Sequence, residues 1–155
     1  MLPELVILLA SRVARPFRGS GYLRDSVALW SRARRRREDW RPHEERCHAV
    51  VRRAMADLPR RRTVVVLGSG LVRDVPLPDL LDGFERVVLV DAVHLHPVRK
   101  AMADHGKVTL VEADLSGVLG WIDGRASGRE DPLAPWRDAE DVDLVISANL
   151  ASQLP

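Results

Sequence analysis

Short, nearly continuous apolar runs dominate the second part of the chain. Four of them occur, separated by segments with helical spacing, at residues 63–67, 86–90, 108–112 and 142–147. Valine-rich runs of this length are typical of strands that are buried on both faces of a parallel sheet. Because helical segments alternate with them, the pattern predicts strand–helix–strand crossovers and an open, mainly parallel α/β sheet of about four strands.

The first 62 residues have a helical pattern instead. Leu23, Val27 and Trp30 recur at helical spacing, and Pro42 is expected in the first turn of a second helix that stops at Pro59. Residues 5–10 are too short an apolar run to span a bilayer and are expected to form a buried helix face. The inward side of the second helix is predicted to consist of Cys47, Val50, Val51, Ala54, Met55 and Leu58.

Charge is divided unevenly between the two regions, 1–62 and 63–155. The first has 16 arginines, no lysine and 7 acids, a balance of +9, whereas the second has a balance of −7. The arginine run 34–37 makes nucleic acid a possible partner, but only Trp30 and Trp40 accompany it for stacking on bases. The alternative is a basic helical layer that packs against an acidic sheet domain.

Cys47 is the single cysteine, so an intrachain disulfide is excluded and a reducing, cytoplasmic location is expected, with no membrane segment. Two groups suggest a metal superficially, His94 with His96 and Cys47 with its neighbours His43 and His48. Neither repeats a recognised zinc spacing, so no metal site is expected. Cys47 is predicted to lie in the core.

Candidate chemistry gathers where the predicted strands end. Gly68-Ser69-Gly70 follows the first strand, Asp91 ends the second and Asp114 follows the third. Ligands of open parallel sheets sit beyond these ends, and the glycines let a ligand approach the backbone closely. Asp91 can accept hydrogen bonds from both hydroxyls of a ribose, and Asp114 from the exocyclic amine of adenine. The pattern therefore indicates a nucleoside site.

The same loop is poorly suited to a diphosphate. Arg73 stands where the G-x-G-x-x-G fingerprint has its third glycine, and Pro76 and Pro78 delay the next helix. No Gly-Lys-Ser/Thr follows the loop, so the P-loop pattern is absent as well. An NAD(P)-dependent oxidoreductase stays a further alternative that these residues weaken.

Four motifs resemble the successive strand ends of the Rossmann-like (class I) S-adenosylmethionine-dependent methyltransferases: VVVLGSG (64–70), VVLVDAV (87–93), VEADLSG (111–117) and VDLVISANLASQLP (142–155). The resemblance covers residues 63–155 and implies a Rossmann-like cofactor domain, S-adenosylmethionine as cofactor and a methyl acceptor of unknown identity. It implies a cofactor site made of Gly68, Ser69, Gly70, Asp91, Ala92, Asp114, Leu115 and Ser147, with Asn149 and Gln153 on the substrate side. No catalytic base is assigned.

Some positions depart from that family. Val66 stands where many members have an acidic residue, Val72 where a third glycine is usual, and no N/D-P-P-F/Y follows the fourth strand, which disfavours DNA-adenine and protein-glutamine methylation. The family has seven strands, so the sequence is expected to be the N-terminal part of a longer protein. The N-terminal helices are expected to form a lid. A catalytically silent Rossmann-like module that binds a nucleotide or a partner is the alternative function.

Overall fold

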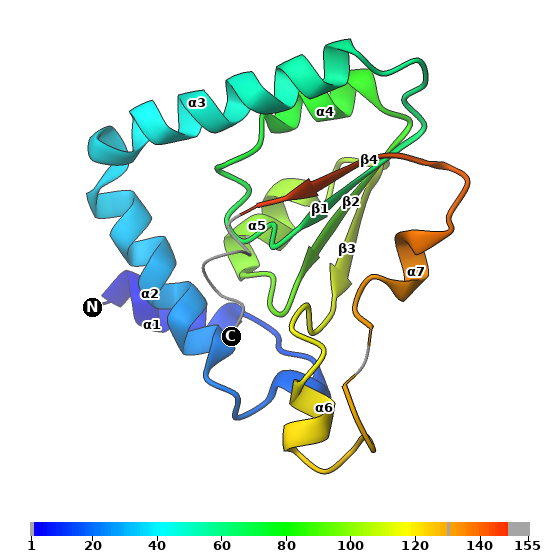
Figure 1. Ribbon diagram of the computed structural model, residues 1–155. Coiled ribbons are helices and arrows are strands. Elements are labelled where there is room, and N and C mark those ends of the chain that lie inside the picture. The colour runs from blue at the N-terminus through cyan, green and yellow to red at the C-terminus, as the bar shows by residue number, and fades with distance from the viewer. Residues whose placement is uncertain (1, 130, 149–155) are drawn as a thin grey trace.

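Four parallel strands form a single open sheet. The computed structural model describes residues 2–129 and 131–148, and its strands are β1 (Thr63–Leu67), β2 (Arg86–Asp91), β3 (Val108–Glu112) and β4 (Val142–Ser147). Their order is β3-β2-β1-β4, with every pair parallel (Figure 1). The predicted α/β, Rossmann-like sheet is confirmed. The strand order reverses between β1 and β4, and ligands of such sheets bind at a switch point of this kind.

Both faces of the sheet are covered at the central strands β1 and β2, which explains their continuous valine runs. Val64 and Val66 of β1 face a layer made of α3 (Arg37–Ala56), α4 (Leu77–Gly83) and α5 (His96–Met102). Val65 and Leu67 face the other side, where Trp136 of α7 (Ala134–Arg137) packs. Side chains alternate along a strand, so a central strand between two layers needs apolar residues at every position. All five residues of β1 are accordingly buried.

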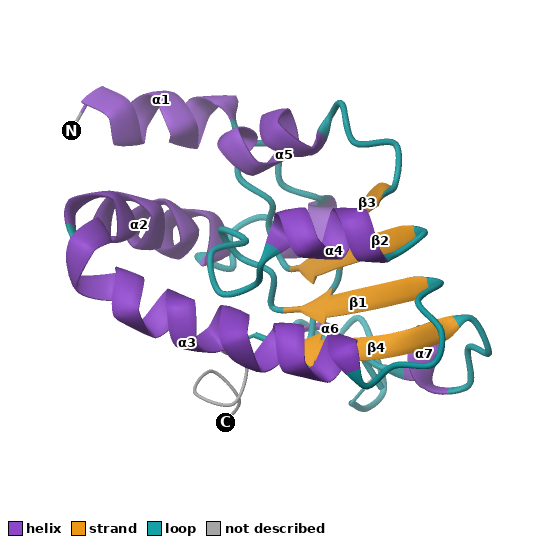
Figure 2. Ribbon diagram, turned by 90° about the horizontal axis from the view of Figure 1, so that it is seen from above, coloured by secondary structure: helices purple, strands orange, loops and turns teal. Residues whose placement is uncertain are grey.

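The N-terminal segment lies beyond the carboxyl ends of the strands. It contains α1 (Leu2–Ala10), the short 3₁₀ helix η1 (Arg15–Phe17) and α2 (Tyr22–Arg35). In Figure 2, α1 and α2 stand past the strand arrowheads. Its buried residues Ile7, Phe17 and Val27 form one cluster with Val93 and Leu95, which follow β2. The segment therefore covers the region where the strands end.

Several expectations for the helices were wrong. In α1 only Ile7 is buried, because this helix contacts α2 and α5 along one side only and leaves Leu9 78% exposed. Helix α3 begins at Arg37, so Pro42 lies inside the helix and not in its first turn. It is an outer-layer helix that packs through a narrow stripe, and its buried residues are Val51 and Met55. Val50 and Ala54 are exposed, and Cys47 is only half-buried.

Among the described residues, no helix combines the length and the apolar character that crossing a bilayer requires.

Candidate functional site

The glycine turn folds back over the end of β2. The backbone N–H groups of Gly68 and Ser69 both donate to the carbonyl oxygen of Val90, at 2.9 and 3.0 Å. Gly68 and Gly70 have φ values of 69° and 48°, a left-handed conformation that side chains with a Cβ rarely adopt. The turn therefore needs glycine at both positions, and it places Ser69 and Gly70 next to the tip of β2.

The side chain of Asp91 hydrogen-bonds to the backbone of this turn. Its Oδ2 accepts a 2.7 Å hydrogen bond from the backbone N–H of Gly70, and its own carbonyl accepts one from Ala113. In a dinucleotide-binding loop, backbone N–H groups of this kind face the pyrophosphate. Here the Gly70 N–H already has an anionic acceptor.

Asp114 holds the turn that leads into α6 (Leu119–Ile122). Its Oδ1 accepts bonds from the N–H and the hydroxyl of Ser116, at 3.0 and 2.5 Å, and its Oδ2 accepts one from the N–H of Leu119 at 2.7 Å. Burial opposes ionisation, but these hydrogen bonds outweigh it and lower the pKa of Asp114. Asp114 is therefore an anion near neutral pH, with a structural role in this turn.

Tyr22, the first residue of α2, lies near the carboxyl ends of the strands. Its pKa is raised, first by burial and then by the negative charge of Asp114, with a further contribution from Asp91 and an opposing hydrogen bond from Ser116. Asp91 ends β2 and Asp114 follows β3, and these strands are parallel neighbours, so both residues lie at the edge of the sheet against which Tyr22 packs. We call this region, formed by Gly68–Gly70, Asp91, Asp114 and Tyr22, the mouth of the sheet.

Tyr22 is a residue of the mouth that sequence reasoning missed. It packs in a cluster with Leu71 and Ala92, from the loops that follow β1 and β2, and with Leu119, the first residue of α6. The only local signal is an aromatic residue directly after the Gly-Ser-Gly of residues 19–21. Nothing in that pattern indicates which part of the sheet it will meet.

The remaining candidate residues have diverse positions. Ser69 is 5% exposed, and within the described residues its hydroxyl has no hydrogen-bond partner. Leu115 packs with Val65, Leu67 and Trp136 on the face of the sheet that α7 covers, and not with the N-terminal segment. Ser147 ends β4 beside Leu67 and is exposed. Asn149 and Gln153 lie outside the described residues.

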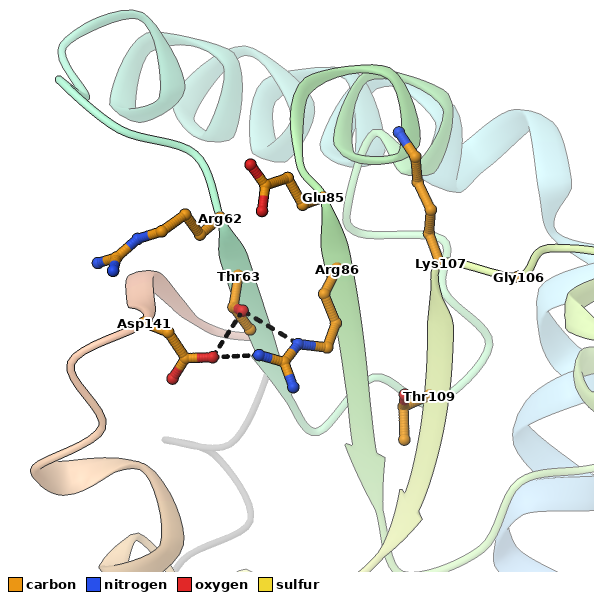
Figure 3. Close-up of a pocket in the computed structure, with 8 residues that line it drawn as sticks. All are labelled: Arg62, Thr63, Glu85, Arg86, Gly106, Lys107, Thr109 and Asp141. Carbon is orange, nitrogen blue, oxygen red and sulfur yellow. Dashed lines mark hydrogen bonds and ion pairs between the residues drawn. The ribbon is translucent and has the colours of Figure 1, made fainter.

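Two hollows exist elsewhere. A groove of about 860 Å³ lies between α2, α3, α4 and α5. A smaller hollow of about 340 Å³ lies at the amino ends of the strands (Figure 3), where Arg86 bonds to both Thr63 and Asp141. Lys107 points away from that hollow and caps the end of α4 through the carbonyls of Leu81 and Phe84. Arg86 and Lys107 thus have partners within the protein, which indicates a structural role for this hollow.

Neither hollow is lined by Gly68, Gly70, Asp91 or Asp114. The N-terminal segment instead closes over the mouth. The N–H of Ala14 donates to Glu112 at the end of β3, and the N–H of His96 donates to Ser11. Access to the mouth therefore depends on the position of this segment.

No protein-family model, no curated protein and no solved structure matches this chain.

Proposed function

We propose that this protein is an S-adenosylmethionine-dependent methyltransferase that holds the adenosyl group at the mouth of the sheet. The observation that carries the proposal is the hydrogen bond from the Gly70 N–H to Asp91 Oδ2. The bond uses a backbone N–H of the glycine turn that would otherwise be available to a diphosphate. A sulfonium cofactor has a positive charge and no phosphate, so the same carboxylate attracts it.

The hydrogen-bonding capacity of the two carboxylates supports this assignment. An ionised carboxylate has about four acceptor positions. Gly70 uses one position of Asp91, which leaves room for both hydroxyls of a ribose. Three bonds from Ser116 and Leu119 already use most of Asp114, which leaves about one position for the exocyclic amine of adenine.

Ser69 is the second supporting feature. Buried hydroxyls almost always have a hydrogen-bond partner, and the Ser69 hydroxyl has none within the described part of the chain. It lies in the glycine turn between Gly68 and Gly70. A polar group of a ligand seated on this turn would satisfy it.

The chemistry asks little of the protein beyond placement. S-adenosylmethionine supplies a methyl group that its positively charged sulfur already activates. Asp91 and Asp114 would orient the adenosyl group, and alignment of the acceptor lowers the barrier further. A general base is needed only where the acceptor arrives protonated. In this proposal the N-terminal segment acts as the lid that admits the cofactor and excludes water.

Binding calorimetry with S-adenosylhomocysteine and with NADH tests the proposal. We expect the first ligand to bind and the second not to bind. Asp91→Asn should weaken binding by about 1.5–3 kcal/mol, because charge-assisted bonds to the ribose are lost. Asp104→Asn, at an exposed position after α5, is the matched control. Unchanged affinity in a folded Asp91→Asn variant rejects the ribose role, and preferential binding of NADH rejects the cofactor.

Methyl transfer from isotopically labelled S-adenosylmethionine to a cell lysate then tests the reaction itself. A catalytically silent nucleotide-binding or interaction module is the second candidate. The extensive local hydrogen bonds of Asp114 and the closed mouth favour it. Binding of S-adenosylhomocysteine without any transfer of label would select this second candidate.

A further inference from the structure

Three metal-binding side chains of different types converge at one point on the surface of α3. His43 and Cys47 are four residues apart, so they lie on the same side of the helix. Asp74 approaches them from the segment between the glycine turn and α4. One donor atom of each residue lies within 4.8 Å of the other two, and no other such group of three occurs in residues 2–129 and 131–148.

Two of the three donor–donor distances match those of a tetrahedral zinc site, and the third is within 4.8 Å. Zinc lies at 2.3 Å from thiolate and at 2.0–2.2 Å from imidazole or carboxylate, so neighbouring donors stand about 3.4–3.6 Å apart. His43 Nε2 is 3.5 Å from Cys47 Sγ and 3.6 Å from Asp74 Oδ1. A ring nitrogen has a single proton or a single lone pair, so it cannot hydrogen-bond well to both neighbours at once. A cation between the three donors accounts for both approaches.

Two contacts hold Asp74 against α3 independently of any ion. The side chain of the preceding residue, Arg73, pairs with Glu44 of α3 at 2.6 Å, and both groups are largely buried. The carbonyl oxygen of Arg73 accepts a 2.7 Å hydrogen bond from His48, also on α3. The backbone that presents Asp74 is thus fixed next to His43 and Cys47. Such preorganisation reduces the entropy that a ligand must overcome on binding.

We propose that His43, Cys47 and Asp74 bind one Zn²⁺ ion, with water as the fourth ligand. Thiolate, imidazole and carboxylate are all zinc ligands, and three protein ligands leave one position open to solvent. The ion ties α3 to the segment that follows the glycine turn. Binding displaces the thiol proton of Cys47 to the solvent, since the thiolate is the ligand. This site lies outside the mouth of the sheet, and its existence does not depend on the proposed cofactor.

Sequence spacing did not reveal this site. The spacing of His43, Cys47 and His48 matches no recognised zinc motif and predicts no metal site. In the structure His48 bonds to the carbonyl of Arg73, and the third donor is Asp74 from a distant loop. Cys47 is half-buried and was expected in the core, but it faces two polar donors.

Co²⁺ titration of the purified, chelator-treated chain tests the proposal, with Zn²⁺ displacing the bound cobalt. We expect one equivalent of Co²⁺, a thiolate-to-cobalt charge-transfer band and d–d bands of tetrahedral intensity. Cys47→Ser should lose the charge-transfer band. Asp74→Asn should lower Zn²⁺ affinity more than about tenfold, since loss of an outer-shell partner alone costs about 10–100-fold. His105→Ala, at an exposed turn, is the control and should bind as the wild type does.

Alkylation of Cys47 in the unmodified chain is a second readout that needs no variant. Saturating Zn²⁺ should protect the thiol from iodoacetamide, and a chelator should restore its reactivity. Absence of a charge-transfer band in the wild type overturns the proposal. Equal Zn²⁺ affinity in Asp74→Asn and His105→Ala, or alkylation that Zn²⁺ does not slow, overturns it as well.

Discussion

Val72 combines an unfavourable backbone conformation with favourable packing. Its φ is 59°, and it is the one residue other than glycine with a positive φ in the described chain. A left-handed conformation costs a residue with a Cβ roughly 1–2 kcal/mol. The side chain packs beside the cluster that joins α3, α4 and α5, which offsets part of this cost. Glycine adopts this conformation without that cost.

Val72→Gly and Val72→Ala separate these two effects. Both variants lose the packing of the valine side chain, but only glycine relieves the left-handed strain. We expect Val72→Gly to be more stable than Val72→Ala by about 1 kcal/mol, since part of the gain is lost to backbone entropy. Urea unfolding at pH 7 measures the difference. An alanine variant as stable as the glycine variant would show that position 72 is not strained.

The residues of the mouth and of the proposed zinc site could be predicted only in part. Gly68, Gly70 and Asp91 follow from the strand pattern, because the ends of parallel strands meet at one edge of the sheet. Tyr22 and Asp74 could not be found in this way. Their neighbours are set by how the N-terminal segment and α3 pack on the sheet, and neither packing has a local sequence signal.

The elements differ in how well their sequence determines them. All four strands begin at their expected residues, and only β2 extends one residue further. The central strands β1 and β2 lie between two layers and therefore need uninterrupted apolar side chains. The helices lie near the surface, where one buried stripe is enough. Residues Val50 and Ala54 of α3 are apolar yet exposed, so composition alone does not identify the buried stripe. Helix bounds and inward faces were accordingly less accurate.

Arg62 and Asp143 join the start of β1 to the start of β4. Asp143 Oδ2 accepts bonds from the backbone N–H and the Nε of Arg62, at 2.7 and 3.1 Å, and Oδ1 accepts one from Nη2 at 2.8 Å. The hydrogen bond from the Arg62 side chain is the main reason that the pKa of Asp143 is lowered to about 2. The pair therefore favours the folded state only while Asp143 is ionised.

Acid should weaken this β1–β4 connection in a defined range of pH. The pKa of Asp143 is lower in the folded chain than in the unfolded chain, so its contribution is complete above about pH 4 and is lost as the pH falls to about 2. We expect Asp143→Asn to be less stable than the wild type at pH 7 and to lose less stability between pH 4 and pH 2. Thermal unfolding across this range is the measurement.

The control for this prediction is Asp104→Asn, which changes an exposed carboxylate far from β4. It should keep the wild-type pH dependence. Parallel curves for the wild type and Asp143→Asn between pH 4 and pH 2 would contradict the role of the pair.

In the whole molecule, ion pairs between residues 1–62 and residues 63–155 neutralise part of the charge difference between these two regions. Arg52 of α3 pairs with Asp79 of α4 at 2.9 Å, and Arg62 pairs with Asp143. These contacts support the interpretation in which a basic helical layer packs on an acidic sheet domain. The arginines of residues 34–37 lie near the turn between α2 and α3 and are exposed.

The N-terminal segment should open as a unit. Phe17 is 5% exposed and packs edge-on against Tyr22, with ring centres 6.1 Å apart. Phe17→Ala removes about 3 kcal/mol of packing, a typical cost for a buried phenylalanine. We expect amide hydrogen exchange to become faster in α1 and α2 while β1 and β2 keep their protection.

Leu29→Ala is the matched control for this measurement, since Leu29 lies on α2 and is 38% exposed. It should leave exchange in α1 close to the wild-type rate. Equal loss of protection in β1 and α2 of the Phe17→Ala variant would show that the N-terminal segment and the sheet unfold together.

The strand order also has a consequence for biosynthesis. The central strand β1 meets β2 soon after both leave the ribosome, but its other neighbour starts at Val142, which pairs with Thr63. Contacts so distant along the chain form slowly, because a long loop must close first. Until residues 142–147 emerge, the nascent chain presents an apolar strand edge to the cell. Chaperones that shield such edges would therefore act on this protein mainly before translation reaches β4.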